Sequence, residues 1–196
     1  MDFVSRWEPN ARERLQQAAM ELYSERGFDQ TTVADIAARA GLTERTFFRY
    51  FPDKREVLFW GSGKLEELLV DGVTRAPDST GPMDAVTAAL EAVAPIFEER
   101  RDLVRQRHTL IVGHTELQER ELIKLASLGS AITKALHRRG VPEPVARLTA
   151  ETGVAVLRVA FEGWVQNPKP SAFVQHVREA RESLRAIAAG RKPTRD

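Results

Sequence analysis

The stretch TVADIAARAGLTERTFFRYFPDKREVL, from Thr32 to Leu58, constrains the fold more than any other part of the chain. Two short runs with helical spacing are separated by Gly41, and Ala37 lies four residues before that glycine. Two short helices that cross steeply need a small residue at the crossing and a residue that tolerates positive φ in the turn. The stretch therefore predicts a helix-turn-helix.

The aromatic residues and the arginines of the second short helix are predicted to lie on opposite faces. Phe47 and Phe51 are four residues apart, which gives an inward face that packs on the preceding helices. The same spacing turns Arg45 and Arg49 outward, where such a helix enters the major groove of DNA. Arginine can bind guanine O6 and N7 together, and hydroxyl groups can bind phosphate oxygens or base edges. The hydroxyl candidates are Thr43, Thr46 and Tyr50, and Lys54 is placed for the phosphate backbone.

Helical periodicity continues through the rest of the chain and predicts an all-α fold of about nine helices. Caps and breakers mark the ends of each one, and the linker APDSTGP at residues 76–82 divides the fourth from the fifth. No segment combines alternating polarity with β-branched residues over the length of a strand. The expected helices span residues 11–26, 32–40, 43–51, 53–75, 83–100, 102–113, 116–139, 143–166 and 171–189.

Composition limits the classes of function that the chain can have. Among 196 residues, 42% are hydrophobic, and the net charge of +1 shows no overall excess of positive charge for a polyanion partner. A nucleic-acid surface must be local, and residues 42–55 carry four cations against two anions. The absence of cysteine excludes disulfides, thiolate metal sites and a cysteine nucleophile. We expect a cytoplasmic protein, because neither a signal peptide nor a membrane span is evident.

Catalytic and metal-binding constellations are not evident either. The chain has no phosphate loop, no H-E-x-x-H and no G-x-S-x-G, so we expect no catalytic residues and no cofactor. His108 and His114 are six residues apart and would not share a helix face, so we expect no metal site. The alternatives are a helical enzyme or small-molecule carrier with a merely structural N-terminal hairpin, and a protein that binds DNA without sequence preference.

The residues from Thr31 to Lys54, following one amphipathic helix, resemble the TetR family of transcriptional regulators. The matching elements are TTVADIA, AGL, TERTFFRYF and PDKREVL. The resemblance implies a helix-turn-helix DNA-binding domain at residues 1–53 and an effector-binding and dimerisation domain at residues 54–196. The family's usual DNA contacts fall on Thr32, Thr43, Glu44, Arg45, Thr46, Phe48, Arg49, Tyr50 and Lys54. The position of Phe48 is commonly a tyrosine, and a phenylalanine would contact a thymine methyl group or a sugar instead of donating to a phosphate.

The resemblance also implies what the larger C-terminal part does. The last two long helices, residues 143–164 and 172–188, would pair with those of a second subunit to form a homodimer. The central helices would surround a small-molecule effector, with Pro95 kinking one wall. The expected pocket residues are Trp60, Phe97, His108, Ile111, His114, Phe161 and Trp164. The expected function is a ligand-responsive regulator, with repression as the expected mode, that binds a palindromic double-stranded operator and is released by its effector.

Overall fold

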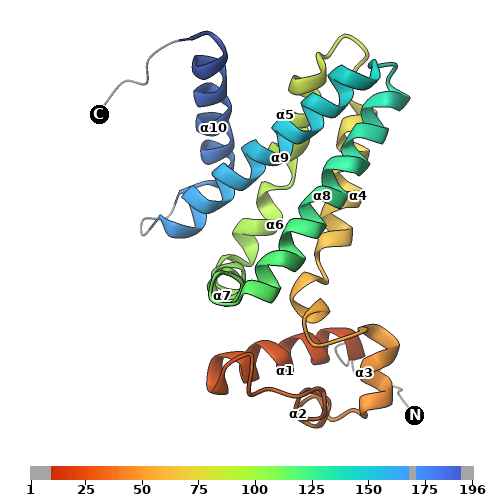
Figure 1. Ribbon diagram of the computed structural model, residues 1–196, viewed down its shortest axis with the longest axis vertical. Coiled ribbons are helices and arrows are strands. Elements are labelled where there is room, and N and C mark those ends of the chain that lie inside the picture. The colour runs from red at the N-terminus through yellow and green to blue at the C-terminus, as the bar shows by residue number, and fades with distance from the viewer. Residues whose placement is uncertain (1–9, 168–170, 191–196) are drawn as a thin grey trace, which may run out of the picture.

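The computed structural model describes residues 10–167 and 171–190, and this part of the chain is helical with no strand (Figure 1). The all-α fold class is therefore confirmed. The elements are α1 (Ala11–Arg26), α2 (Val33–Arg39), α3 (Glu44–Tyr50), a 3-10 turn (Glu56–Phe59), α4 (Ser62–Arg75), α5 (Pro82–Ala92), α6 (Ala94–Glu99), α7 (Arg101–Val112), α8 (Thr115–Arg138), α9 (Glu143–Gln166) and α10 (Phe173–Ala188). Two of the expected helices, 53–75 and 83–100, are each divided in the structure.

Helices α1 to α3 form a small unit at one end of the molecule (Figure 1). The side chain of Asn10 accepts from the backbone N–H of Arg12 and begins α1. Thr32 begins α2 through a capping box with Asp35, and the Thr43 hydroxyl accepts from a backbone N–H to begin α3. Gly41, at φ 64°, makes the tight turn between α2 and α3, which only glycine adopts without strain.

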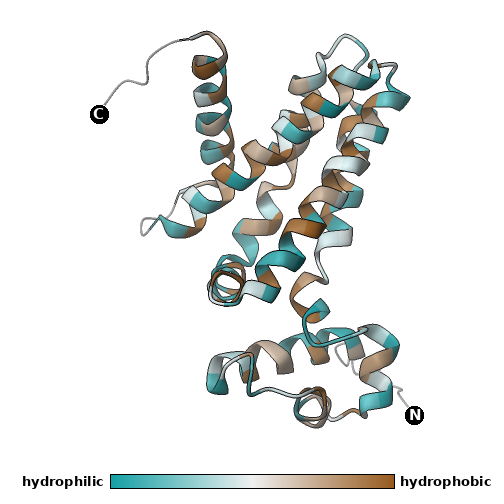
Figure 2. Cartoon of the chain, in the orientation of Figure 1, coloured by the Kyte–Doolittle hydropathy of each residue, from teal (hydrophilic) through white to brown (hydrophobic). Residues whose placement is uncertain are grey.

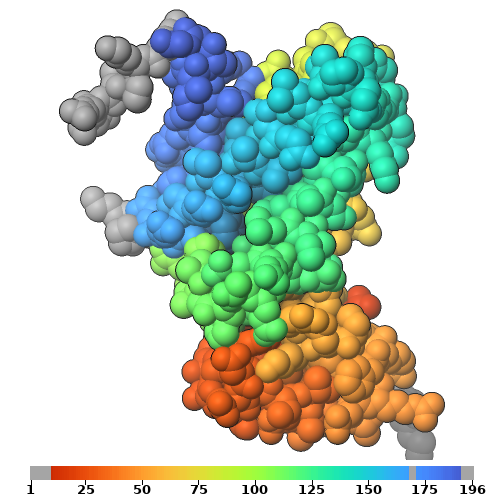
Figure 3. Space-filling view, in the orientation of Figure 1, coloured from red at the N-terminus to blue at the C-terminus, as the bar shows by residue number. Residues whose placement is uncertain are grey.

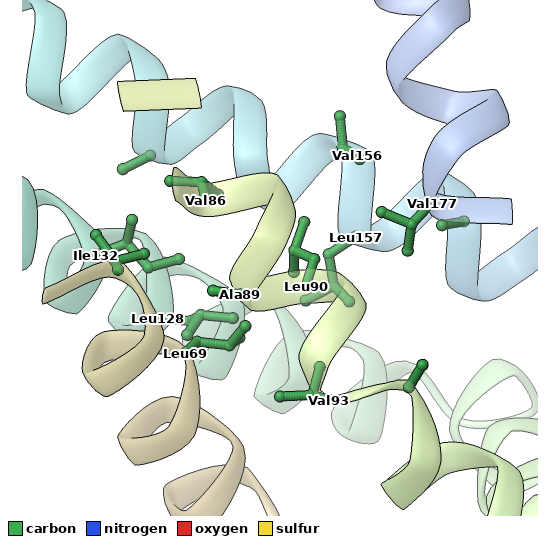
Figure 4. Packing of buried hydrophobic residues seen from close by; sticks show 14 of the residues in the cluster. Leu69, Val86, Ala89, Leu90, Val93, Leu128, Ile132, Val156, Leu157 and Val177 are labelled. Atoms are coloured by element: carbon green, nitrogen blue, oxygen red, sulfur yellow. The ribbon is translucent and has the colours of Figure 1, made fainter. Parts of the chain in front are cut away.

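The remaining helices form the larger unit, whose core lies between α4, α5, α8 and α9 (Figure 4). Apolar side chains from these helices converge there. Hydrophobic and hydrophilic residues alternate along each of these helices (Figure 2). At Gly153 of α9 an added Cβ would lie 2.5 Å from Cγ1 of Val86 on α5. This glycine therefore permits the close approach of α9 to α5.

A second core joins the small unit to the base of the larger one. Its buried residues come from α1 to α3, from the 3-10 turn and from the α7–α8 corner, and they include Leu15, Leu22, Phe28, Ile36, Phe47, Phe51, Val57, Leu58, Phe59, Ile111 and Leu117. In the space-filling view the small unit lies directly against this corner (Figure 3). The boundary that we expected between residues 53 and 54 runs through this one continuous core. The outer ends of the two expected domains, residues 1–9 and 191–196, lie outside the described residues.

The single helix expected at residues 53–75 is wrong. The Asp53 side chain accepts from the backbone N–H groups of Arg55 and Glu56. The element that follows is a 3-10 turn in which Val57, Leu58 and Phe59 are all buried. An α-helix would bury one stripe, whereas three consecutive apolar residues must contact neighbours on several sides. The α-helix begins only at Ser62, after Gly61.

The single helix expected at residues 83–100 is also wrong, because α5 ends at Ala92 and α6 begins at Ala94. Pro95 lies in the first turn of α6, where a proline is tolerated because its missing N–H needs no partner. In a continuous helix the same proline would remove a hydrogen bond and its ring would clash with the preceding turn. The expected kink is therefore a complete break.

None of the described helices is both long enough and apolar enough to cross a membrane.

Candidate DNA-binding surface and effector region

Helix α3 has the two faces that its sequence predicts. Phe47 and Phe51 are buried in the second core, with their ring centroids 5.6 Å apart. Arg45 and Arg49 are exposed on the opposite side. Phe48 lies on that side too, with 54% of its surface exposed and its ring in edge contact with Phe47. The outward face therefore presents two guanidinium groups and one apolar ring.

The threonine hydroxyls of this surface take part in hydrogen bonds at the N-termini of α2 and α3. The hydroxyl of Thr32 donates to the Asp35 carboxylate at 2.7 Å, and its backbone N–H donates to the same carboxylate at 3.0 Å. These two hydrogen bonds lower the pKa of Asp35. The hydroxyls of Thr43 and Thr46 lie 3.0 Å apart, and that of Thr43 also accepts from the Thr46 backbone N–H. Thr32 and Thr43 are exposed, and Glu44 beside them is exposed without an ion-pair partner among the described residues. Their proposed DNA contacts would be made from the starts of α2 and α3.

Lys54 has a different setting from the one that its sequence position suggested. Its Nζ donates to the carbonyl oxygens of Phe28 at 2.8 Å, Thr31 at 3.0 Å and Asp29 at 3.3 Å. The ammonium also lies 4.4 Å from the centre of the Phe28 ring. An ammonium has three donors, and all three are directed at the loop between α1 and α2. Lys54 holds this loop and leaves no donor for a phosphate.

A residue outside the predicted set, Arg12 of α1, joins the surface at the end of α3. Its guanidinium carbon lies 5.5 Å from the centre of the Tyr50 ring, and that of Arg49 lies 5.0 Å from the same point. Arg49 also donates to the Tyr50 hydroxyl at 3.3 Å. Arg12 is 38 positions before Tyr50, so no local sequence signal could indicate the contact.

The structure divides the seven expected pocket residues into two groups. Phe97, His108, Phe161 and Trp164 come together from α6, α7 and α9, and Phe161 lies 5.8 Å from Phe97 and 5.6 Å from His108, measured between ring centroids. Trp164 is fully buried, and its indole N–H donates to the carbonyl of Ser171 at 3.0 Å. This group forms one aromatic cluster within the larger unit.

The other three expected pocket residues belong to the second core. Ile111 is buried there, and Trp60 packs against it. His114 contacts the edge of the Phe28 ring at 5.2 Å, and its Nδ1 lies 2.7 Å from the carbonyl oxygen of Leu110. Helix α7 explains the division, because His108 lies toward the larger unit while Ile111 lies toward the small one. In the described structure these three residues therefore belong to a different cluster from the other four.

Two surface grooves lie away from these residues. A groove of about 560 Å³ lies between α1 and the end of α2, beside Arg14, Arg39 and Gly41. A smaller one of about 270 Å³ lies between α4 and α8, beside Glu66, Lys134 and two serines. The described residues include no group of three His, Asp or Glu side chains placed to hold a metal ion.

Polar contacts fasten the 3-10 turn to the larger unit, and we call the set formed by Glu56, Leu58, Arg107, Arg120 and Lys124 the junction. The Glu56 carboxylate pairs with Arg120 and, at 3.0 Å, with Lys124. Arg107 donates to the carbonyl oxygen of Leu58 at 2.6 Å, and burial lowers the pKa of its guanidinium. Burial alone would raise the pKa of Glu56, but the hydrogen bonds from Arg120 and Lys124 lower it overall. The junction is therefore held by charged groups on both sides.

The comparisons with known proteins cover both units. A family model described as bacterial regulatory proteins, tetR family, matches residues 15–59. A second model, described as the MftR C-terminal domain, matches residues 80–189. The mycofactocin biosynthesis transcriptional regulator MftR of Mycobacterium tuberculosis is 29% identical over 80% of this chain and 81% of its own length. The repressor LfrR of Mycolicibacterium smegmatis is 29% identical over 70% of this chain and 71% of its own.

Solved structures share the fold. The regulator FadR of Bacillus subtilis, crystallised in complex with stearoyl-CoA, superimposes with a TM-score of 0.61 at 17% sequence identity. The superposition covers 88% of this chain and 96% of that one. At this level of identity the likeness concerns the arrangement of helices.

Proposed function

Because the chain belongs to the TetR family of transcriptional regulators, we propose that it is a homodimeric repressor that binds a palindromic operator and is released by a small molecule. Members of the family are DNA-binding regulators rather than enzymes. A DNA partner also favours action in the cytoplasm, as expected from the sequence.

The outward face of α3 supports the proposal that the protein recognises a specific operator sequence. No carboxylate of the described chain pairs with Arg45 or Arg49, and both are exposed on the outward face of α3. Arginine side chains without a carboxylate partner on a recognition helix suit guanine edges or phosphates, and each good guanine pair discriminates by about 1–3 kcal/mol. Phe48 suits a thymine methyl group. The proposed contact set is Thr32, Thr43, Glu44, Arg45, Thr46, Phe48, Arg49 and Tyr50, without Lys54.

An apolar stripe along α9 supports the homodimer. Val145, Leu148 and Val159 are 48%, 70% and 57% exposed, and Ala155 between them is exposed as well. Their spacing of three, seven and four residues keeps them on one side of the helix. Single exposed apolar residues are ordinary, but a row along one helix marks a contact surface. A two-fold dimer would bring the same stripe from both subunits together, with α10 beside it.

The junction supports a route by which an effector could release DNA. A continuous fourth helix cannot transmit movement from the effector to the small unit, because the 3-10 turn interrupts it. Helix α7 instead carries His108 in the aromatic cluster and Arg107 in the junction, one residue apart. A ligand that displaced the aromatic cluster would move α7 and, through the junction, the small unit. It must bind the released shape more tightly than the DNA-bound one.

The effector pocket is proposed around Phe97, His108, Phe161 and Trp164, which contact one another in the described structure. Long-chain acyl-CoA thioesters are the first compounds to test, because FadR of Bacillus subtilis has the same fold and was solved with stearoyl-CoA. A mostly apolar, aromatic region suits an acyl chain. A thioester that binds without releasing operator DNA would contradict the release route.

Selection from random duplex DNA tests the proposal. The wild-type chain should enrich a palindrome with half-sites about one helical turn, or about 34 Å, apart. The double variant Arg45→Ala and Arg49→Ala should enrich none while keeping the wild-type melting temperature. A variant that still selects the palindrome would refute the assignment of these two residues.

Two rival functions predict other results in the same experiment. Salt-sensitive binding with no enriched motif would indicate a sequence-independent DNA binder. Absence of DNA binding would favour a helical carrier or enzyme whose N-terminal hairpin is only structural.

A further inference from the structure

The contact of Arg12 with Tyr50 points to a DNA contact that the recognition helix does not make alone. We propose that Arg12, Arg49 and Tyr50 form a phosphate clamp, in which two guanidinium groups held against one ring bind a single phosphate of the operator backbone. This clamp rests on the proposed function, and it adds α1 to the surface that touches DNA. It also gives Tyr50 the role of a platform for the two arginines.

Geometry brings the two arginines together. Their guanidinium carbons lie 5.5 Å and 5.0 Å from the centre of the Tyr50 ring, which is within the range of a cation–π interaction. Arg49 is also held by its hydrogen bond to the Tyr50 hydroxyl. Two like charges on one aromatic ring repel each other, so the arrangement is favourable only if something else compensates the charge.

Nothing in the described chain supplies that compensation. No carboxylate of residues 10–167 or 171–190 lies within the 4.0 Å ion-pair distance of either guanidinium. Three other arginines of the small unit differ, because Arg26, Arg39 and Arg55 all pair with carboxylates at 2.7–3.3 Å. The Nε of Arg12 is buried and has no described hydrogen-bond partner. An anion from outside the described chain is the missing partner.

The position on the fold identifies this anion as a phosphate of the DNA backbone. In a helix-turn-helix the first residues of the recognition helix contact base edges. Tyr50 is the last residue of α3, and Arg12 approaches it from the start of α1. This end of the surface faces the flanking strand, where phosphates are the anions available. Arginine binds a phosphate through two parallel donors, which fixes the register of the protein on the duplex.

Salt dependence distinguishes a phosphate contact from a structural role. Each phosphate contact contributes about 0.9 to the slope of log affinity against log salt. Arg12→Ala should therefore lower the slope by up to about 1.8 for a dimer with two clamps. The affinity advantage of the wild type over the variant should then shrink by up to about twelvefold between 50 and 200 mM salt. The enriched motif should not change, because the clamp reads no base.

Two further variants make the test specific. Arg12→Lys keeps the charge and should keep the wild-type slope. Arg75→Ala makes the same change in charge at the far end of α4, where Arg75 pairs with Asp71, and should leave both affinity and slope unchanged (Figure 1). Melting temperatures of all variants show whether each one folds.

Replacing single phosphates of the operator by neutral methylphosphonates locates the contact. One position per half-site should weaken binding by the wild type more than binding by Arg12→Ala, which still contacts that phosphate through Arg49. An unchanged salt slope in Arg12→Ala, with the wild type still selecting its palindrome, would overturn the clamp alone. A wild type that selects no palindrome would overturn the proposed function and the clamp together.

Discussion

Replacing Leu148 by glutamate is expected to dissociate the proposed dimer and leave each subunit folded. The side chain is 70% exposed in the isolated chain, so most of its apolar surface is available for burial in a dimer. Complete burial of a leucine contributes about 1.5–3 kcal/mol, and the exposed part contributes about 1–2 kcal/mol. Because a two-fold interface contains each residue twice, the loss is about 2–4 kcal/mol per dimer. The dissociation constant should rise between about 30-fold and 1,000-fold, and burying two carboxylates would raise it further.

Sedimentation over a dilution series measures the dimer dissociation constant directly, and the melting temperature of the subunit reports its folding. Leu122→Glu is the matched control, because Leu122 is 57% exposed on α8 and lies outside the α9 stripe. Leu122→Glu should dimerise as the wild type does. Equal dissociation constants for the wild type and Leu148→Glu, or equal weakening by both substitutions, would refute the α9 interface.

Two further predictions concern the subunit itself. The Arg139 guanidinium donates to the carbonyl oxygens of Val73, Ala76, Pro77 and Thr80 around the end of α4. Arg139→Ala should therefore lower the free energy of unfolding by about 2–4 kcal/mol and the melting temperature by about 4–16 °C. The neighbouring Arg138 is exposed and should tolerate alanine. Equal melting curves for the two variants would contradict the role of Arg139. The hydrogen bonds that Glu56 accepts from its basic partners outweigh burial, so the pKa of Glu56 is lower in the folded protein than in the unfolded chain. The ionised carboxylate therefore stabilises the fold above the ordinary pKa of a glutamate. This stabilisation is lost as the pH falls through the pKa that Glu56 has in the folded protein. Urea unfolding should show Glu56→Gln less stable than the wild type at pH 7, with a smaller difference at about pH 3.5; a pH-independent difference would contradict the ion-pair assignment.

Local signals predict most of the secondary structure of this chain. Gly41 makes the positive-φ turn that its place between two short periodic runs predicts, and Thr32 and Thr43 begin α2 and α3. Helix α9 spans Glu143–Gln166, which are the residues expected from its periodicity. These features depend on neighbours within one or two turns of helix, which a single sequence displays.

Long-range packing accounts for what the sequence did not predict. Ile111 has the apolar character of a pocket residue, but it packs against a core built by helices almost a hundred positions earlier. Lys54 has the charge and the place of a phosphate contact, yet its donors hold a loop more than twenty positions before it. Arg12 lies on a polar part of α1 and gains its proposed role only by meeting Tyr50 in space. Residue type and spacing do not indicate which distant residues will be in contact.

We propose that two copies of the chain bind two half-sites on one face of an operator. Titration of the selected duplex, compared with the same duplex carrying about five extra base pairs at its centre, tests this most directly, because half a helical turn places the half-sites on opposite faces. We expect two chains per selected duplex, at least ~10³ tighter binding than to scrambled DNA, and loss of most of that preference after the insertion. One chain per duplex, or equal affinity for the two spacings, would contradict it.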